Sequence, residues 1–207
     1  MFCPNCGTQN QETASTCTKC GFNLKGAAAP KFKGTTIPTW QEAIDEIRGK
    51  AGLCPETKSP ELYSKHGLDM EELVLLALKK NGLEKPDSST PFLFQTFGSA
   101  GIKRLAAKGL QHPLMQLATA GTKWTDQSLK QVKKLCVALS PPKGDATAKL
   151  VKTAHAVGLQ VVPFTFNQKG LPPEFSSIRD EMEHALYTIG IDGLFTDNPD
   201  LFPGHTG

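Results

Sequence analysis

The sequence predicts an α/β protein with a parallel sheet of about six strands, preceded by a small metal-binding segment. Apolar, strand-like segments alternate with segments of helical periodicity from residue 37 to residue 207, which is the pattern of a parallel sheet with helical crossovers. The strand-like segments lack strict polar alternation, as expected for strands buried on both faces. Four of the six cysteines form two Cys-x-x-Cys pairs close to the N-terminus.

The two cysteine pairs predict a structural zinc site. Its four thiolates belong to Cys3, Cys6, Cys17 and Cys20. Four thiolates close a tetrahedral shell and leave no open coordination position. Two redox-active dithiols are the alternative, but pairs this close would compete for the same oxidant. The segment resembles the zinc-ribbon modules of many bacterial proteins, so we expect a ribbon over residues 1–24 that folds only with its ion.

The net charge of +3 is concentrated in one short stretch. Residues 21–36 contain Lys25, Lys31 and Lys33 and no acidic residue, whereas residues 37–207 sum to zero. Gly, Ala, Pro and Thr dominate this stretch, so residues 25–36 are expected to form a flexible basic linker. A nucleic-acid binder usually carries a basic stripe on its folded part, and we therefore expect no nucleic-acid partner.

Two features of the chain indicate a cytoplasmic protein. The longest apolar run, Leu73 to Leu78, is far too short to span a bilayer. The N-terminal residues include Cys, Asn and Gln where a secretory signal would need an apolar segment. In a reducing compartment, paired cysteines indicate metal binding rather than disulfides.

The main segment, residues 37–207, contains six predicted helices and six predicted strands. The first helix starts with a capping-box pattern, in which Thr39 precedes Trp40 and Glu42 follows three residues after the cap. The helices are expected at 40–48, 69–80, 99–108, 126–134, 145–157 and 177–189. The strands are expected at 51–57, 91–97, 113–118, 135–140, 159–166 and 191–195.

Polar residues follow each predicted strand. In parallel sheets, ligands bind at the carboxyl ends of the strands, so these residues are expected to form a ligand-facing rim. They are Glu56, Lys58, Gln95, Thr96, Gln116, Ser140, Lys143, Thr165, Asn167, Thr196 and Asp197. The alternative is that polar residues cap any strand end, whatever its function.

Glu56 and Lys58 are the most informative members of this rim. Strand alternation places both side chains on one face, about 6.6–7 Å apart. A carboxylate beside an ammonium suits a divalent cation together with a phosphoryl oxygen. Spacing alone equally allows a local ion pair.

Several runs of the main segment resemble the glycerophosphodiester phosphodiesterase family. They include GLCPETKSPELYSKHGLDMEELVLLALKKNGL, PFLFQTFGSAGIKRL followed by PLMQLA, GLQVVPFTFN, and GIDGLFTDNPD. The resemblance implies a (β/α)₈ barrel of the TIM type. It also implies hydrolysis of glycerophosphodiesters to an alcohol and glycerol 3-phosphate with calcium or magnesium, as part of lipid and glycerol metabolism.

The resemblance assigns roles to residues of this chain. Glu56 resembles a metal-binding glutamate, and Lys58 resembles a lysine beside the phosphate. Phe164 and Asn167 resemble the aromatic and amide residues that line the pocket, and Gln95 is expected to contact substrate from its strand end. Asp197 and Asn198 match the turn after the last strand.

Other family motifs are absent from this sequence. The family begins with a His-Arg-Gly motif, continues with a Glu-x-Asp metal pair and then a His-Asp motif, and none of the three is present. With six of eight strands, residues 37–207 are expected to form an incomplete barrel. The five histidines stand in neither family context, and His66, His112, His155 and His184 are expected to be surface or packing residues.

These departures predict impaired or absent hydrolysis, because general acid–base cleavage needs a proton acceptor and a proton donor. Two alternatives are a non-catalytic protein that binds a partner or a phosphorylated ligand, and a truncated or chimeric reading frame joined near Thr36 and Ile37. The edges of strands 51–57 and 191–195 are expected to be open, and open edges favour self-association or a protein partner. The zinc ribbon is the other candidate surface for a protein partner.

Overall fold

The computed structural model describes residues 8, 10–11, 14–19, 36–86 and 89–204. The chain divides into two compact units, Met1–Ala43 and Ile44–Gly207. Within the described ranges, no helix combines the length and the apolar character needed to cross a membrane.

In the first unit, the side chain of Asn10 connects two short segments through both its amide oxygen and its amide nitrogen. Asn10 Oδ1 accepts hydrogen bonds from the backbone N–H and the hydroxyl of Thr18, at 3.0 and 3.2 Å. Asn10 Nδ2 donates to the sulfur of Cys17 at 3.6 Å, and Cys17 is buried. Cys3, Cys6 and Cys20 lie outside the described residues, so the ribbon and the linker at 25–36 stay predictions.

The predicted capping box at the start of α1 (Trp40–Ile47) is confirmed. Thr39 donates its backbone N–H to Glu42 Oε2 at 2.6 Å, and the Glu42 N–H donates to Thr39 Oγ1 at 3.3 Å. The hydrogen bonds from the Thr39 backbone and hydroxyl lower the pKa of the Glu42 carboxyl.

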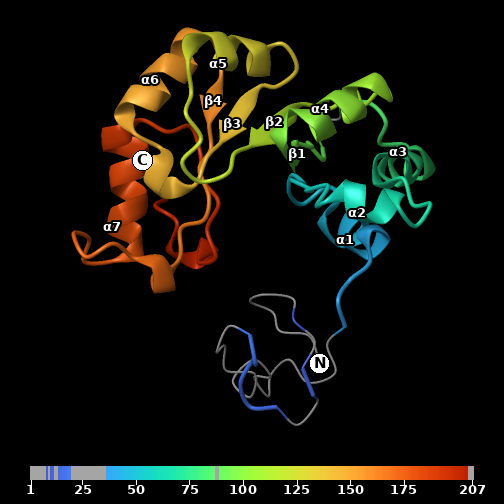
Figure 1. Ribbon diagram of the computed structural model, residues 1–207, viewed down its shortest axis with the longest axis horizontal. Coiled ribbons are helices and arrows are strands. Elements are labelled where there is room, and N and C mark those ends of the chain that lie inside the picture. The colour runs from blue at the N-terminus through green and yellow to red at the C-terminus, as the bar shows by residue number, and fades with distance from the viewer. Residues whose placement is uncertain (1–7, 9, 12–13, 20–35, 87–88, 205–207) are drawn as a thin grey trace. The chain divides into compact units, whose positions relative to one another are not determined.

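A parallel sheet of four strands forms the centre of the second unit (Figure 1). The strands are β1 (Phe94–Phe97), β2 (Leu114–Leu117), β3 (Ala138–Ser140) and β4 (Gln160–Val161), in that order across the sheet. The helices α4 (Gly98–Ala107), α5 (Asp126–Lys133) and α6 (Ala148–Ala156) alternate with them along the chain. The predicted alternation is thus confirmed over this region.

The two outermost predicted strands are wrong as full strands, although their chain segments lie where a sheet would continue. The segment before β1 makes single parallel bridges from Leu53 to Phe92 and from Glu56 to Gln95. At the other side, Phe166 bridges to Thr196. The barrel is therefore incomplete, with an α/β arrangement of the TIM-barrel type.

Prolines explain why these segments pair only through single bridges. Pro55 and Pro163 have no N–H to donate to a strand ladder, but each still accepts through its carbonyl. The Gln95 N–H donates to Pro55 at 2.9 Å, and the Phe195 N–H donates to Pro163 at 2.9 Å. The predicted strand 159–166 accordingly shortens to β4 with separate bridges at Phe164 and Phe166.

The remaining helices follow the predicted segments with local changes. The helix predicted at 69–80 is α3 (Met70–Lys80), whose cap Asp69 accepts a hydrogen bond from the Glu72 N–H at 2.9 Å. The helix predicted at 177–189 divides into α7 (Ile178–Glu183) and the π-helix η4 (His184–Ile189). The unpredicted elements are α2 (Pro60–Ser64), η2 (Lys143–Asp145), η3 (Gln168–Gly170) and η5 (Pro199–Leu201).

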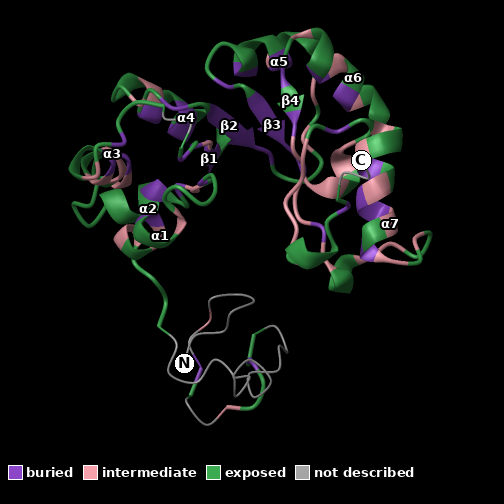
Figure 2. Cartoon of the chain, turned by 180° about the vertical axis from the view of Figure 1, so that it is seen from behind, coloured by how far each residue is buried: buried purple, intermediate pink, exposed green. Residues whose placement is uncertain are grey.

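The hydrophobic core lies between the sheet and its helices (Figure 2). Phe94, Met115 and Leu139 of the strands are fully buried, as are Ile102 and Leu129 of the helices. The strand register places Phe94 and Leu139 on the face of Gln116, beside α4 and α5, and Met115 on the face of Gln95. Cys136, just before β3, is 3% exposed, and burial raises the pKa of its thiol to about 12.

Candidate functional site

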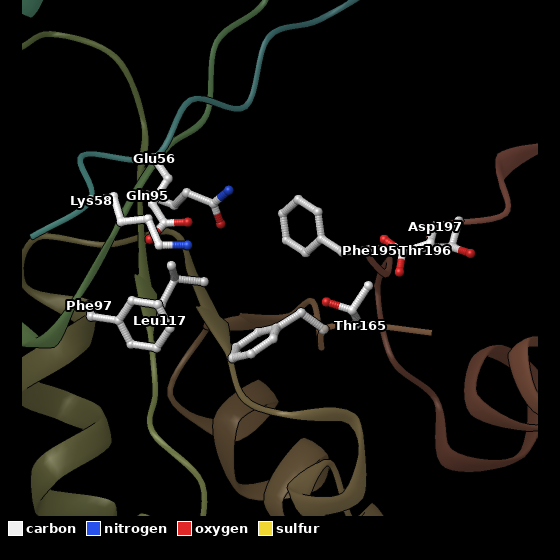
Figure 3. Close-up of a pocket in the computed structure, with 10 residues that line it drawn as sticks. Glu56, Lys58, Gln95, Phe97, Leu117, Thr165, Phe195, Thr196 and Asp197 are labelled. Carbon is white, nitrogen blue, oxygen red and sulfur yellow. The ribbon is translucent and has the colours of Figure 1, made fainter. Parts of the chain in front are cut away.

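A pocket of about 430 Å³ opens beside the carboxyl end of β1 and β2 (Figure 3). Strand ends and the segments that flank the sheet supply its walls. The lining residues are Glu56, Lys58, Gln95, Phe97, Leu117, Phe164, Thr165, Phe195, Thr196 and Asp197. The structure thus gathers six members of the predicted rim around one cavity.

One wall of the pocket is charged. Glu56 and Lys58 both line it, whereas Thr57 between them is buried and only 2% exposed. This confirms the prediction that the two side chains share a face. They form no salt bridge with each other, and Lys58 has no hydrogen-bond or ion-pair partner among the described residues.

Gln95 stands beside Glu56 in this wall, because the two residues pair across a parallel bridge. Its Nε2 donates to the carbonyl of Cys54 at 3.3 Å. The Oε1 atoms of Gln95 and Glu56 are both shielded from solvent and have no hydrogen-bond partner in the described part of the chain.

Thr165, Phe195, Thr196 and Asp197 lie across the cavity from Glu56, Lys58 and Gln95, whereas Phe97 and Leu117 lie on the side of Lys58 (Figure 3). Phe97 and Phe164 meet edge to face, with ring centroids 6.0 Å apart and an interplanar angle of 83°. Ionisable side chains therefore stand on both sides of the cavity, and the rings of Phe97, Phe164 and Phe195 complete its lining.

Five members of the predicted rim do not line this pocket. Thr96 donates its hydroxyl to the Thr57 carbonyl at 3.0 Å, and Ser140 donates to the Val162 carbonyl at 2.5 Å. Gln116 lies on the other face of the sheet, in a groove beside α4 and α5. These polar groups support the fold rather than this cavity.

Asn167 and Lys143 are the other two. Asn167 caps η3, where its Oδ1 accepts from the Gly170 N–H at 2.7 Å, so substrate contact by this residue stays a prediction. Lys143 forms an ion pair with the buried Glu181 at 2.6 Å and donates to the Gly170 carbonyl at 2.7 Å. It faces a second cavity of about 360 Å³.

No histidine of the described chain lines the pocket. His112 is buried against the rings of Phe92 and Phe94, and its Nε2 lies 2.7 Å from the Leu83 carbonyl. His155 pairs with Asp192 at 2.8 Å. Both are packing or surface residues, as expected from the sequence.

The apolar lining residues Phe97, Leu117 and Phe195 were missed at the level of sequence. Phe97 carried a usable signal, because alternation from Gln95 points it to the same side. Leu117 reaches the pocket through the strand register, which pairs it with Phe97 and which the sequence does not specify. Phe195 lies in a segment without a regular strand and gave no such signal.

A comparison with known protein families shows which family the chain belongs to. The model of the glycerophosphoryl diester phosphodiesterase family matches residues 11–201. The chain belongs to this family. The match begins inside the segment expected to form the zinc ribbon, and it covers every residue of the pocket.

Individual relatives agree with the family match. A glycerophosphodiester phosphodiesterase of Bacillus subtilis is 28% identical over 178 residues, with 84% of this chain and 56% of the relative covered. A glycerophosphodiester phosphodiesterase of Haemophilus influenzae is 27% identical over 209 residues, with 79% of this chain and 57% of the relative covered. The chain thus spans little more than half the length of these curated relatives.

A solved structure shares the fold. The phosphodiesterase of Oleispira antarctica, in complex with the product sn-glycerol-3-phosphate, superposes with a TM-score of 0.62 at 23% identity. The similarity covers 79% of this chain and 59% of the solved one. It supports the incomplete TIM-type fold described above.

Proposed function

We propose that this chain is a glycerophosphodiester phosphodiesterase with impaired hydrolysis, whose pocket binds a glycerophosphodiester or its glycerol 3-phosphate product. The observation that carries the proposal is the projection of Glu56 and Lys58 into one cavity at the strand ends. Membership of the family supports it. The relatives' names supply the reaction class, and the Oleispira structure was solved with that product.

The proposed roles follow from the chemistry of each side chain. Lys58 neutralises the phosphate, because its ammonium is exposed and has no protein partner among the described residues. Phe164 and Gln95 contact the rest of the substrate from either side of the cavity. Thr165 and Thr196 each offer a hydroxyl donor at the aromatic end.

Glu56 is proposed to hold a calcium or magnesium ion. These hard cations prefer carboxylate and carbonyl oxygens, and the unpartnered Oε1 of Glu56 fits such a ligand. In the described residues there is no group of three or more His, Cys, Asp or Glu placed to hold a metal, so the protein would supply few ligands. When bound, the ion would polarise a phosphoryl oxygen.

Impaired hydrolysis follows from what surrounds the phosphate position. Among the described residues, only Glu56, Lys58 and Asp197 bring ionisable groups to the lining. A positioned general acid or base typically contributes about 10²- to 10⁴-fold in rate. We therefore expect product binding to persist while turnover is low.

Two measurements on the full chain test this function. Hydrolysis of glycerophosphocholine is followed with calcium or magnesium, and binding of glycerol 3-phosphate is measured by calorimetry. We expect binding together with slow turnover, and both should weaken in Glu56→Gln and Lys58→Met. Absence of both activities would refute the proposal, and turnover that is unchanged in Glu56→Gln would refute the site. Binding without any turnover would favour the non-catalytic alternative.

We also propose that Cys3, Cys6, Cys17 and Cys20 hold a structural zinc ion. The donation from Asn10 to the buried Cys17 sulfur supports this, because N–H···S contacts stabilise a thiolate ligand. Metal analysis of the purified chain should find about one zinc per chain, and Cys17→Ser together with Cys20→Ser should remove it. Retention of zinc in that double variant would contradict the assignment.

A further inference from the structure

Glu56 and Gln95 place two unpaired oxygen atoms next to each other at the end of the pocket that contains Lys58 (Figure 3). The residues are bridge partners on adjacent parallel segments, which run about 4.8 Å apart. Both side chains line the same cavity. Each Oε1 is an acceptor without a donor in the described part of the protein.

The amide of Gln95 is held in one orientation. Its Nε2 donates to the Cys54 carbonyl at 3.3 Å, and the residue is only 8% exposed. A second carbonyl is a poor neighbour for Oε1 and a good one for NH₂, so this contact fixes which end of the amide remains unpaired. The unpaired end is therefore the oxygen.

We propose that Gln95 is a second protein ligand of the divalent cation, shared with Glu56. This inference rests on the proposed function only for the presence of the ion. A carboxylate oxygen and an amide oxygen form a ligand pair that calcium and magnesium accept. Gln95 then supplies part of the coordination that one carboxylate alone leaves incomplete.

Two other partners would satisfy the oxygens less well. A bridging water could donate to both, but it would leave the negative charge of the half-buried Glu56 carboxylate without compensation. The ammonium of Lys58 lines the same pocket but forms no salt bridge with Glu56. A small dication satisfies both oxygens and compensates the charge.

The test is calcium and magnesium binding to the full chain, measured by calorimetry without any substrate. Thiolates bind these hard cations poorly, so the N-terminal cysteines do not interfere. We expect Gln95→Leu to weaken binding about tenfold and Gln95→Glu to tighten it by a similar factor, because it adds a charged ligand. Gln116→Leu is the matched control, since Gln116 is an equally buried glutamine on the opposite face, and its affinity should stay within about twofold of the wild type.

The two Gln95 variants are expected to change the ion affinity in opposite directions, so each of them can refute the inference. Circular dichroism checks that each variant folds, and if Gln95→Leu does not, Gln95→Glu alone decides. Unchanged affinity in Gln95→Leu, weaker affinity in Gln95→Glu, or no ion binding by the wild type would each overturn the inference. Ion binding without hydrolysis would contradict the proposed function alone, and hydrolysis with unaltered ion affinity in Gln95→Leu would contradict this inference alone.

Discussion

Lys58 and Lys143 both follow strand segments on the carboxyl side of the sheet, but their surroundings differ in every respect. Lys58 is exposed and lines the pocket without a partner among the described residues. Lys143 is largely buried, pairs with Glu181, and lies 5.5 Å from the centre of the Phe166 ring. The comparison shows that a lysine after a strand can either pair with a buried carboxylate and stabilise the fold, or stay unpaired and available to a ligand.

The largest effect is expected from breaking the buried pair. Lys143→Met leaves the Glu181 carboxylate buried without its cation, which should cost about 3 kcal/mol of unfolding free energy. Urea denaturation measures this loss, and Lys58→Met is the matched control, with an expected change within about 0.5 kcal/mol. Equal losses in the two variants would remove the distinction between the lysines.

For ligand affinity, in contrast to stability, the substitution of Lys58 should have a large effect. Lys58→Met removes a charged contact to phosphate worth about 1.5–3 kcal/mol, so glycerol 3-phosphate should bind at least about tenfold more weakly. Calorimetry measures the change, with Lys65→Met as a control on another exposed lysine. An unchanged affinity in Lys58→Met would exclude Lys58 from the phosphate site.

Neutralising Glu56 should stabilise the fold while it weakens ion binding. The Oε1 of Glu56 is shielded without a donor, so Glu56→Gln should gain about 0.5–1 kcal/mol in the absence of divalent ions. Glu181→Gln should instead destabilise the protein. Denaturation in the presence of a chelator tests both signs, and a loss of stability in Glu56→Gln would mean that its carboxylate has a structural partner.

The smallest expected effect concerns an exposed ion pair and its pH dependence. The Glu72 N–H and the Lys108 ammonium lower the pKa of the Asp69 carboxyl below its usual 3.8. Because the folded pKa is lower than the unfolded one, Asp69 contributes stability above the unfolded value, and that stability is lost as the pH falls through the folded value. Asp69→Asn should therefore flatten the stability profile below about pH 4. A profile identical to that of the wild type would argue against the cap.

Sequence patterns predicted the central part of the fold better than its margins. Four predicted strands and the helices between them are present because apolar periodicity records burial directly. The outer segments 51–57 and 191–195 failed as strands, since Pro55 and Pro163 interrupt the ladders that flank them. A proline within an apolar run was the available warning.

The site was predicted only where a local sequence pattern fixes the direction of the side chains. Alternation in the segment that contains Glu56 and Lys58 was sufficient to place both in one pocket. The buried pairing of Lys143 with Glu181 was not predictable, because the two residues are far apart in sequence and their contact depends on how α7 packs. The aromatic part of the lining likewise depends on tertiary contacts such as that between Phe97 and Phe164.

Because Cys136 is buried, its reactivity can serve as a probe of local opening. A thiol with a pKa of about 12 and almost no exposed surface hardly reacts with an alkylating reagent at neutral pH. Alkylation then occurs only when the chain around Cys136 opens transiently, and peptide mapping distinguishes it from reaction at the other cysteines. Its rate therefore reports how often the region around Cys136 opens, and a slower rate on addition of ligand would show that occupancy of the cavity stabilises this region.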